Sequence, residues 1–436
     1  MTSIQRIIAI IFLAMGVAYT SYIPNQNDFI QIFIGYSLAF GSYFYLMNHR
    51  ERISLSFILG LAIIPVFSVP NLSDDIYRFI WDGYCTINGL SPYQYLPREV
   101  LAFNLPGLDN ILFQQLNSPD YYAIYPTISQ LFFGLATTIS SSFESQVILL
   151  KCIYVTLHIV GSFAAYNALQ KTNQNPNNIF YYAANPLVLI EGIGNLHAEI
   201  NMISCLFLAF YLYKHNRKTL SAFFFAAAIA IKITPILLCG YFLFRYKNKI
   251  ARNYLILIAV FTTILFIPII IGLLQGGFLE SIDLYFRKFE FNGSIYYLLR
   301  FLGQKLTGYN QIQVLGPLLF LLFFSFIIRR WWLDKTQCSI LNFTQNALLV
   351  WTIYFFISTT IHPWYIISLL GFTIILPVRF VLLWSYVITL TYINYSYPIF
   401  HENLWIVALE YTIVFLTFAA EYKYDLSIKD LDGHSQ

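Results

Sequence analysis

The sequence predicts an all-α integral membrane protein built as one multi-span domain. Hydrophobic residues make up 58% of its 436 residues and charged residues only 11%, whereas soluble chains carry about 25% charged residues. Apolar stretches follow one another from the first residues to about residue 420. They suffice for a bundle of about 11–14 transmembrane helices and leave no room for a sizeable soluble domain. We expect the remaining 421–436 to form a short polar cytoplasmic tail.

The first three apolar stretches set the expected orientation. They cover about 4–22, 29–47 and 53–69, and the basic run His49-Arg50-Glu51-Arg52 lies between the second and third. Short loops rich in Lys and Arg stay in the cytoplasm. The next loop, about 70–125, is therefore expected on the extracytoplasmic face, and its polar and apolar alternation indicates amphipathic helices there.

Later basic clusters follow the same rule. Those at 214–218, 245–252 and 329–330 are expected in the cytoplasm. The turns between the clusters then face outward. These outer turns are, in chain order, about 193–200, 232–236, 274–310, 359–364 and 396–403.

Two segments require a special arrangement to keep this orientation. Residues 126–140 are expected to form a re-entrant or surface-lying helix, because a full crossing would invert the later turns. Residues 219–246 must leave and return between two basic clusters, which predicts two half-helices broken at Thr234-Pro235. Broken helices at membrane depth occur where they are buried in protein or line a cavity.

An acidic motif opens the first outer loop. In Asn71–Gly83, a helix would place Asp74, Asp75, Arg78 and Asp82 on one face. One interpretation is an amphipathic helix whose charges only pair with one another. The functional interpretation rests on two facts: adjacent Asp74 and Asp75 repel, and one arginine does not neutralise three acids.

Further unusual polar and aromatic residues fall in the outer turns, and each also has a structural explanation. Asn195 suits a helix C-cap, a lysine at a span end often reaches the headgroups, and His-Pro-Trp-Tyr suits an interfacial aromatic belt. Their expected location on one face instead suits an anionic phosphate ligand beside a carboxylate base. The residues are Asn195, His197, Lys232, Asn292, Arg300, His362, Trp364 and Tyr365.

These motifs, in this order, resemble the GT-C superfamily of multi-span glycosyltransferases. The likeness runs through Ser73–Arg78, Trp81-Asp82-Gly83, Gly194–His197, Lys232–Pro235 and His362–Tyr365. It is greatest to bacterial mannosyltransferase-like members and to the enzyme that adds the first mannose to GPI precursors. One departure is His197-Ala198-Glu199, where many relatives carry an Asn-Asp pair or a lone Asp. Either Glu199 replaces that Asp and places its carboxylate at a different distance, or this turn supplies no functional carboxylate.

The resemblance implies an inverting transfer of a sugar, with mannose as the default, from a polyprenyl-phosphate donor in the plasma membrane. Asp74 or Asp75 is the expected general base. The resemblance does not identify the acceptor; we expect a glycan or a lipid, with the bilayer as the other partner and no nucleic acid. The expected substrate-binding residues are Tyr77, Arg78, Asp82, Asn195, His197, Lys232, Asn292, Arg300, His362, Trp364 and Tyr365.

No motif requires a cofactor. The carboxylates of Asp74 and Asp75 are ligands that Mg²⁺ or Mn²⁺ could use, so a divalent metal stays open. Two other functions also stay open: a polymerase or ligase of lipid-linked glycans, and a transporter or flippase of lipid-linked sugars. A transporter would often show paired broken helices in two repeats, whereas only 219–246 shows such a break.

Overall fold

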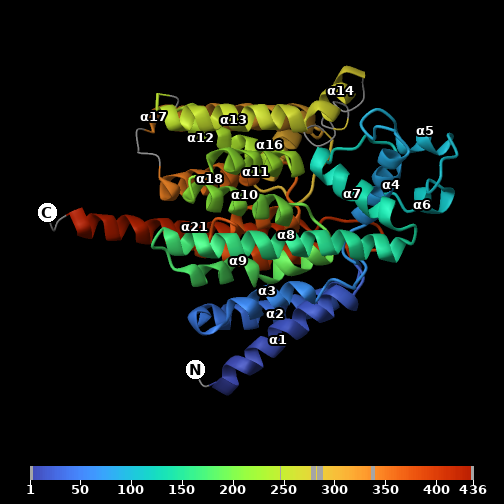
Figure 1. Ribbon diagram of the computed structural model, residues 1–436. Coiled ribbons are helices and arrows are strands. Elements are labelled where there is room, and N and C mark those ends of the chain that lie inside the picture. Colours follow the sequence, from blue (N-terminus) through green and yellow to red (C-terminus); the bar gives the residue numbers. More distant parts are fainter. Residues whose placement is uncertain (1–2, 246, 276–280, 282–287, 335–338, 434–436) are drawn as a thin grey trace.

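The computed structural model describes residues 3–245, 247–275, 281, 288–334 and 339–433. Within these residues the fold is helical and contains no β-strand, which confirms the predicted all-α class (Figure 1). One isolated bridge pairs Phe291 with Thr360.

Nine α-helices and four short 3-10 or π segments form the described N-terminal part up to the turn before Glu199. They are α1 (Ser3–Tyr22), α2 (Phe29–Met47), η1 (Arg50–Arg52), α3 (Leu55–Gly60), η2 (Leu61–Ile63), α4 (Asp75–Ile87), α5 (Pro97–Leu101), α6 (Asn110–Gln114), α7 (Thr127–Ile139), α8 (Phe143–Lys171), η3 (Pro176–Ile179), α9 (Phe180–Ala183) and η4 (Val188–Gly194).

The described C-terminal part continues in the same way. It contains α10 (Glu199–Lys214), α11 (Lys218–Ile231), η5 (Thr234–Leu238), α12 (Cys239–Leu243), α13 (Lys249–Leu265), α14 (Ile267–Gln275), α16 (Ile295–Thr307), α17 (Ile312–Leu333), α18 (Ile340–Ile357), η6 (Pro363–Ile366), α19 (Ile367–Leu370), α20 (Arg379–Val387), η7 (Ile388–Tyr395) and α21 (Leu404–Gly433).

Six described helices are long and apolar enough to cross a membrane, or up to eight spans if each of two bent pairs counts as one. The protein is therefore a multi-pass membrane protein, while the larger predicted count stays a prediction. The six are α1, α2, α8, α17, α18 and the Leu404–Glu421 part of α21. Helix α21 continues as far as Gly433, and the cytoplasmic location of the polar tail stays a prediction.

The third expected span, 53–69, is not one continuous helix, and its crossing of the membrane stays a prediction. The structure has only the six-residue α3 and the three-residue η2 there, followed by turns. Proline at 65 lacks the amide hydrogen that would continue the helix. The carbonyl oxygens of Pro65 and Ser68 accept hydrogen bonds from the buried Lys151 Nζ, at 2.9 and 2.7 Å. Apolar composition alone could not reveal this partner.

The two segments that required a special arrangement, 126–140 and 219–246, both form short helices in the structure. Helix α7 has 13 residues, about 20 Å, which is too short for a hydrocarbon core of about 30 Å. Helix α11 ends at Ile231, Lys232 has an extended backbone, and the chain continues as η5 and α12. The predicted break therefore occurs two residues before Thr234-Pro235.

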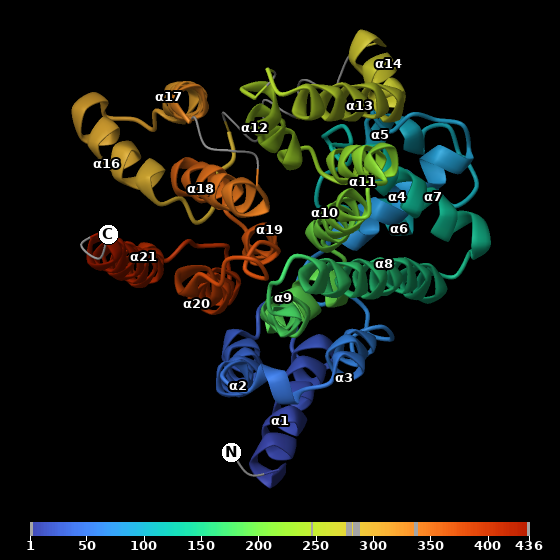
Figure 2. The same ribbon diagram turned by 60° about the vertical axis from the view of Figure 1, so that its left-hand side comes forward.

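The two ends of the helix bundle differ in what they carry. Figure 1 shows α4, α5 and α6 gathered at the end far from both termini, which we call the α4 end. Figure 2, a view turned by 60°, shows the α16–α21 group on one side of α10 and the α4–α8 group on the other. Helix α10 runs from Glu199, towards the α4 end, to Lys214 at the opposite end. We call this opposite end the basic end, because the basic cluster 214–218 lies there.

Small residues allow close packing between long helices. A Cβ atom placed on Gly161 of α8 would lie 2.8 Å from the Cα of Ser204 and 2.9 Å from its carbonyl oxygen on α10. Gly16 of α1 meets Ala39 of α2 in the same way, at 2.6 Å from its backbone nitrogen. Such contacts hold membrane helices together through van der Waals packing.

We expect Gly161→Val to destabilise the protein by about 1–3 kcal/mol, because the added carbons force α8 away from α10. Thermal unfolding of the purified protein in detergent measures the change. Gly41→Val on α2 is the matched control, since nothing lies within 4 Å of its Cβ position. Equal melting temperatures for the two variants would contradict the close packing.

Candidate active site

Asp74 and Asp75 lie at the beginning of α4. Asp74 occupies the N-cap position with an exposed side chain, and Asp75 is the first helical residue and half-buried. The Asn117 amide donates a 2.8 Å hydrogen bond to Asp75 Oδ1. Burial raises the pKa of both carboxyls; for Asp75, hydrogen bonds from Asn117 and Tyr125 and the Lys232 charge oppose this rise.

Arg78 pairs with Asp82, so it does not hold either of the adjacent aspartates, Asp74 and Asp75, in place. Its Nε lies 2.7 Å from Asp82 Oδ1, and both side chains are buried. Its Nη1 also donates to the carbonyl oxygens of Ser118 and Tyr121, at 2.9 and 2.8 Å. The pair therefore anchors the loop that carries Asn117. Gln130 of α7 completes the enclosure by donating to Asp82 Oδ2 at 2.9 Å.

Tyr77 also packs within the protein at this end. Its ring stacks on Phe143 at the start of α8, with ring centroids 5.3 Å apart and an interplanar angle of 13°. Tyr77 thus connects α4 to α8. Asp82 connects α4 to α7, and Arg78 connects it to the loop around residues 118–121.

Lys232 lies at the break after α11, where its ammonium faces two groups. It forms an ion pair with Glu199, the first residue of α10, and lies 4.4 Å from the centroid of the Tyr365 ring. The Glu199 carboxylate therefore partly neutralises Lys232. The lysine side chain is still 28% exposed. Because an ammonium has three donors, a ligand can share Lys232 with Glu199.

Four rings from three segments stack beside Lys232. The centroid distances are 3.6 Å for His197–Trp364, 4.4 Å for Trp364–His362 and 4.6 Å for His362–Phe291. The backbone bridge between Phe291 and Thr360 brings the last two segments together. The stack leaves His362 and Trp364 partly exposed.

His362 is a neutral hydrogen-bonding group at neutral pH. Burial, with the Lys232 charge adding to it, lowers the pKa of His362 to about 3. Its Nδ1 atom has no hydrogen-bond partner among the described residues. A neutral imidazole can still donate one hydrogen bond to an anionic ligand.

Electrostatic interactions place these parts in one site. The charge of Lys232 acts on both Asp75 and His362, and Glu199 also interacts with Asp75. Tyr395, at the end of η7, lies within electrostatic reach of Asp75 and Asp74. Acid, ammonium, imidazole and aromatic rings from five elements therefore meet at the α4 end.

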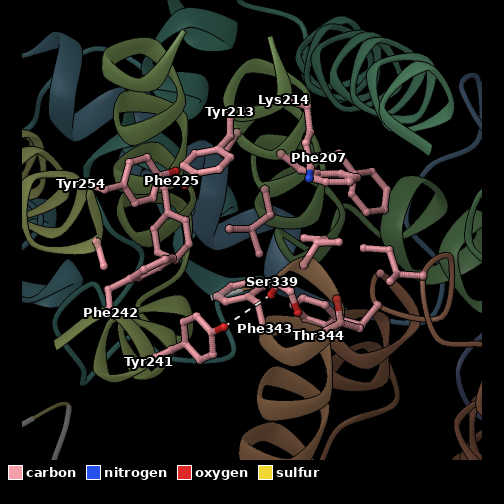
Figure 3. A pocket seen from close by; sticks show the side chains of 18 of the residues that line it. Phe207, Tyr213, Lys214, Phe225, Tyr241, Phe242, Tyr254, Ser339, Phe343 and Thr344 are labelled. Atoms are coloured by element: carbon pink, nitrogen blue, oxygen red, sulfur yellow. Dashed lines mark hydrogen bonds between the residues drawn. The ribbon is translucent and has the colours of Figure 1, made fainter. Parts of the chain in front are cut away.

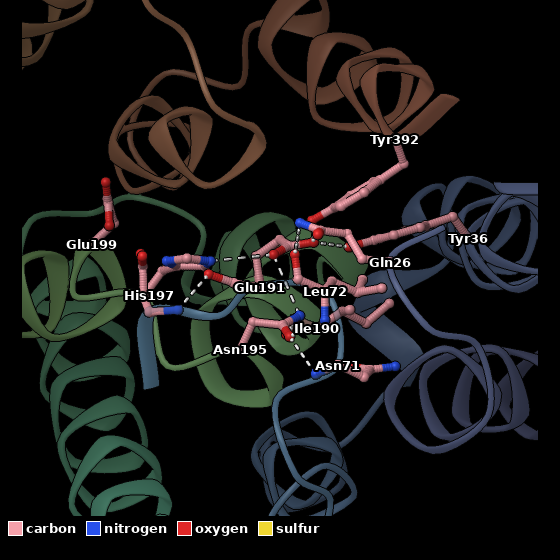
Figure 4. A network of polar contacts seen from close by, with 12 residues as sticks. Gln26, Tyr36, Asn71, Leu72, Ile190, Glu191, Asn195, His197, Glu199 and Tyr392 are labelled. Atoms are coloured by element: carbon pink, nitrogen blue, oxygen red, sulfur yellow. Dashed lines mark hydrogen bonds and ion pairs between the residues drawn. The ribbon is translucent and has the colours of Figure 1, made fainter. Parts of the chain in front are cut away.

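Asn195 lies behind this site, within the polar network shown in Figure 4. Its Oδ1 accepts hydrogen bonds from the backbone amides of Asn71 and Leu72, at 3.1 and 3.0 Å, just before Asp74. Its Nδ2 donates to Ile190 O at 3.1 Å and Glu191 Oε2 at 3.4 Å. Asn195 therefore positions the acidic motif from a fully buried location.

Glu191 connects that network to distant helices. Its Oε1 accepts hydrogen bonds from the hydroxyls of Tyr36 on α2 and Tyr392 on η7, at 2.5 and 2.7 Å. Its Oε2 lies 3.6 Å from Nε2 of His197 (Figure 4). Glu191 belongs to the π-helix η4, a geometry that is frequent at functional sites. The network thus orients the histidine that stacks on Trp364.

Asn292 and Arg300 form a second cluster next to the ring stack. The Asn292 amide donates to both carboxylate oxygens of the buried Glu410 on α21, each at 3.2 Å. Arg300 pairs with Glu290 and lies 4.1 Å from the Tyr297 ring centroid. Both residues are thus engaged with α16 and α21 side chains, while the neighbouring Phe291 reaches the ring stack.

The described residues contain no group of three or more His, Cys, Asp or Glu side chains arranged to hold a metal ion. Asp74 and Asp75 offer the carboxylate pair that remains the candidate for a divalent cation.

The N-terminal part of the chain matches a known family. Residues 20–246 match the family described as alpha-(1->6)-mannopyranosyltransferase, N-terminal domain, which is more than half of the 436 residues. The chain belongs to this family. It is therefore a membrane glycosyltransferase of the mannosyltransferase kind. Searches of curated proteins and of solved structures gave no match.

The family match includes some parts of the site and leaves others outside. Asp75, Glu199 and Lys232 lie within the matched residues, whereas His362 and Trp364 lie beyond them. The aromatic side of the site is therefore supplied by the C-terminal part of the chain.

Sequence reasoning left the role of Glu199 open and did not identify two further residues of the candidate site. Glu199 had a usable signal, because it is an acid two residues from His197 in an expected outer turn. Asn117 and Tyr395 had none: Asn117 lies in a loop without a motif, and Tyr395 is one of 34 tyrosines. Only the folded chain brings them to Asp75.

We expect Asn195→Ala to destabilise the protein by about 1–3 kcal/mol, because two buried backbone amides before Asp74 lose their acceptor. The melting temperature and the mannosyl-transfer rate should both fall. Asn167→Ala is the matched control, since that side chain donates within α8 to Phe163 O. An Asn195→Ala variant that matches this control in both measurements would refute the positioning role.

Proposed function

We propose that this protein transfers a mannosyl group from a polyprenyl-phosphate donor to an acceptor hydroxyl, as an inverting GT-C-type enzyme. Membership of the mannopyranosyltransferase family supports mannose, and the family's name suggests an α-(1→6) linkage. The observation that carries the proposal is the meeting of Asp75, Lys232 and His362 at the α4 end. A carboxylate base and phosphate-binding donors are what this reaction requires.

Asp75 is the proposed general base. As the acceptor oxygen attacks the anomeric carbon, its proton passes to the Asp75 carboxylate and the new glycosidic bond forms. Asp75 suits this role better than Asp74, because it is fixed by Asn117 and shares the site with Lys232. Its raised pKa strengthens it as a proton acceptor near neutral pH. Asp74 lies at the exposed rim, where acceptor hydroxyls could bind.

Lys232 and His362 are the proposed donors to the leaving phosphate. The bond between the anomeric carbon and the phosphate oxygen breaks, and the oxygen keeps the electron pair. The diester thus becomes a monoester and gains negative charge, which preorganised donors stabilise. Lys232 supplies the positive charge and His362 a neutral donor. The Trp364 ring beside them offers an apolar face for the sugar.

The proposed location is the extracytoplasmic face of the plasma membrane. The basic runs after α2 and α10 belong to the end opposite α4, and the positive-inside rule assigns that end to the cytoplasm. The donor's polyprenyl chain would then remain in the bilayer with its phosphate at the α4 end. A glycan or lipid acceptor approaches from outside.

Asp75→Asn should lower kcat by about 10²–10⁴-fold, because the amide does not accept the proton. Asp74→Asn should lose much less activity. The assay measures release of polyprenyl phosphate from a labelled mannosyl donor, with thermal unfolding to show that each variant is folded. Full turnover by folded Asp75→Asn would remove this residue from the mechanism.

Lys232→Gln should reduce transfer by about 10²–10³-fold, the usual loss for one transition-state donor. It should also move the acid limb of the kcat/KM profile to higher pH. The sign follows from Asp75: it must be ionised to act, and loss of the Lys232 charge raises its pKa.

The matched control for that variant is Lys232→Arg, which keeps the charge and should keep the acid limb near its original pH. An unchanged limb in Lys232→Gln would show that Asp75 is not the titrating base. Unchanged donor use would refute the phosphate role of Lys232.

A further inference from the structure

An apolar cavity lies at the basic end of the bundle, away from the candidate active site. Its volume is about 280 Å³, and it is bounded by α10, α11, α13 and α18 (Figure 3). Aromatic side chains dominate its wall. They include Phe207, Tyr213, Phe225, Phe242, Tyr254 and Phe343.

The distance to the active site follows from α10. Glu199 begins this 16-residue helix and contacts Lys232, while Lys214 ends it and lines the cavity. At 1.5 Å per residue, the two ends lie about 22 Å apart. The cavity is therefore not a part of the site where the transferred sugar reacts.

Lys214 provides a cation at this cavity. Figure 3 shows its side chain reaching toward the cavity from one edge. Its ammonium has no hydrogen bond or ion pair with any described residue. The nearby Arg245 differs, because Asp334 lies 2.8 Å away and neutralises it. Lys214 is thus available to an anionic ligand.

The polar groups in the wall are mostly used within the protein. Asn248 caps α13 and Ser339 caps α18 through hydrogen bonds to backbone amides. The hydroxyl of Thr344 is the exception: it is fully buried, lines the cavity and has no hydrogen-bond partner among the described residues. It offers one donor inside an otherwise apolar space.

An apolar chamber with one buried hydroxyl and a cation at its edge fits an amphiphile with an anionic head. Its volume lies just below the roughly 300–1,000 Å³ of drug-sized ligand sites, so it suits part of one hydrocarbon chain. Basic pockets between membrane helices on the cytoplasmic side bind anionic lipid headgroups. Lys214 is the basic residue that lines this cavity.

We propose that an anionic phospholipid binds here, with one acyl chain in the cavity and its phosphate on Lys214. The Thr344 hydroxyl is available to an ester carbonyl oxygen. The occupant links α10 and α11 with α13 and α18. Because α10 and α11 carry Glu199 and Lys232 at their far ends, binding stabilises the helices on which the active site depends.

The test uses the full-length purified protein in detergent with added phosphatidylglycerol or phosphatidylcholine of the same chains. Phosphatidylglycerol should raise the melting temperature more than phosphatidylcholine does, and native mass spectrometry should show it bound. Lys214→Gln should weaken this binding by about fivefold, which corresponds to about 1 kcal/mol for one cation near an anionic headgroup. Arg217→Gln, which removes a charge from the same turn without lining the cavity, should bind as the wild type does.

A second variant tests the chamber itself. Ala251 of α13 is buried and lines the cavity, so Ala251→Phe should fill it and abolish the lipid-dependent shift while Lys214 remains. The comparison uses the shift on adding lipid, so any change in basal stability does not affect the result.

Four outcomes would overturn the proposal. Two concern the lipid and the variants: equal melting-temperature shifts with both lipids, and equal binding of phosphatidylglycerol by Lys214→Gln and Arg217→Gln. Two concern other ligands: the same melting-temperature shift with inorganic phosphate alone, and displacement of phosphatidylglycerol by equimolar polyprenyl phosphate. The last two would assign the site to a free anion or to the donor's carrier lipid.

Discussion

Backbone groups that leave helical geometry within a membrane protein need partners from the protein itself, and this constraint governs the segment from Pro65 to Leu72. Lys151 of α8 donates to its first carbonyl oxygens, and Asn195 accepts from its last two amides. The segment is thereby fixed at both ends without being a helix. The beginning of α4, and with it Asp75, is placed relative to α8 and η4 by these two side chains.

The charge balance of the site explains its aromatic surroundings. Lys232 is already paired with Glu199, so the site has little excess positive charge for an anionic donor. In the proposed function, neutral groups therefore carry part of the phosphate recognition: His362 is uncharged, and the Tyr365 ring lies against the ammonium. A carboxylate near a phosphate is tolerable when its proton affinity is raised, as burial does for Asp75. The proposed base and the proposed phosphate donors can thus share one end of the bundle.

The acidic motif shows where local spacing stops being informative. Helical periodicity correctly put Arg78 and the three aspartates in one helical segment, but Asp74, Asp75 and Asp82 all lie three or four residues from Arg78. Spacing therefore could not select the partner. The choice of Asp82 follows from Gln130 on α7 and the carbonyl groups of residues 118–121, which enclose that pair. None of these lies within a helical turn of the motif.

The sequence by itself determined the membrane class, most of the long apolar helices, the interruption after α11 and the acidic beginning of α4. Each depends on the composition or the hydrophobic periodicity of neighbouring residues, and both can be read from the sequence. Tertiary structure alone decided that Lys151 meets the carbonyl groups of Pro65 and Ser68, that Lys232 meets Glu199, and that Trp364 stacks on His197. These outcomes require contacts between residues more than thirty positions apart, and hydrophobic periodicity carries no information about which distant helices become neighbours.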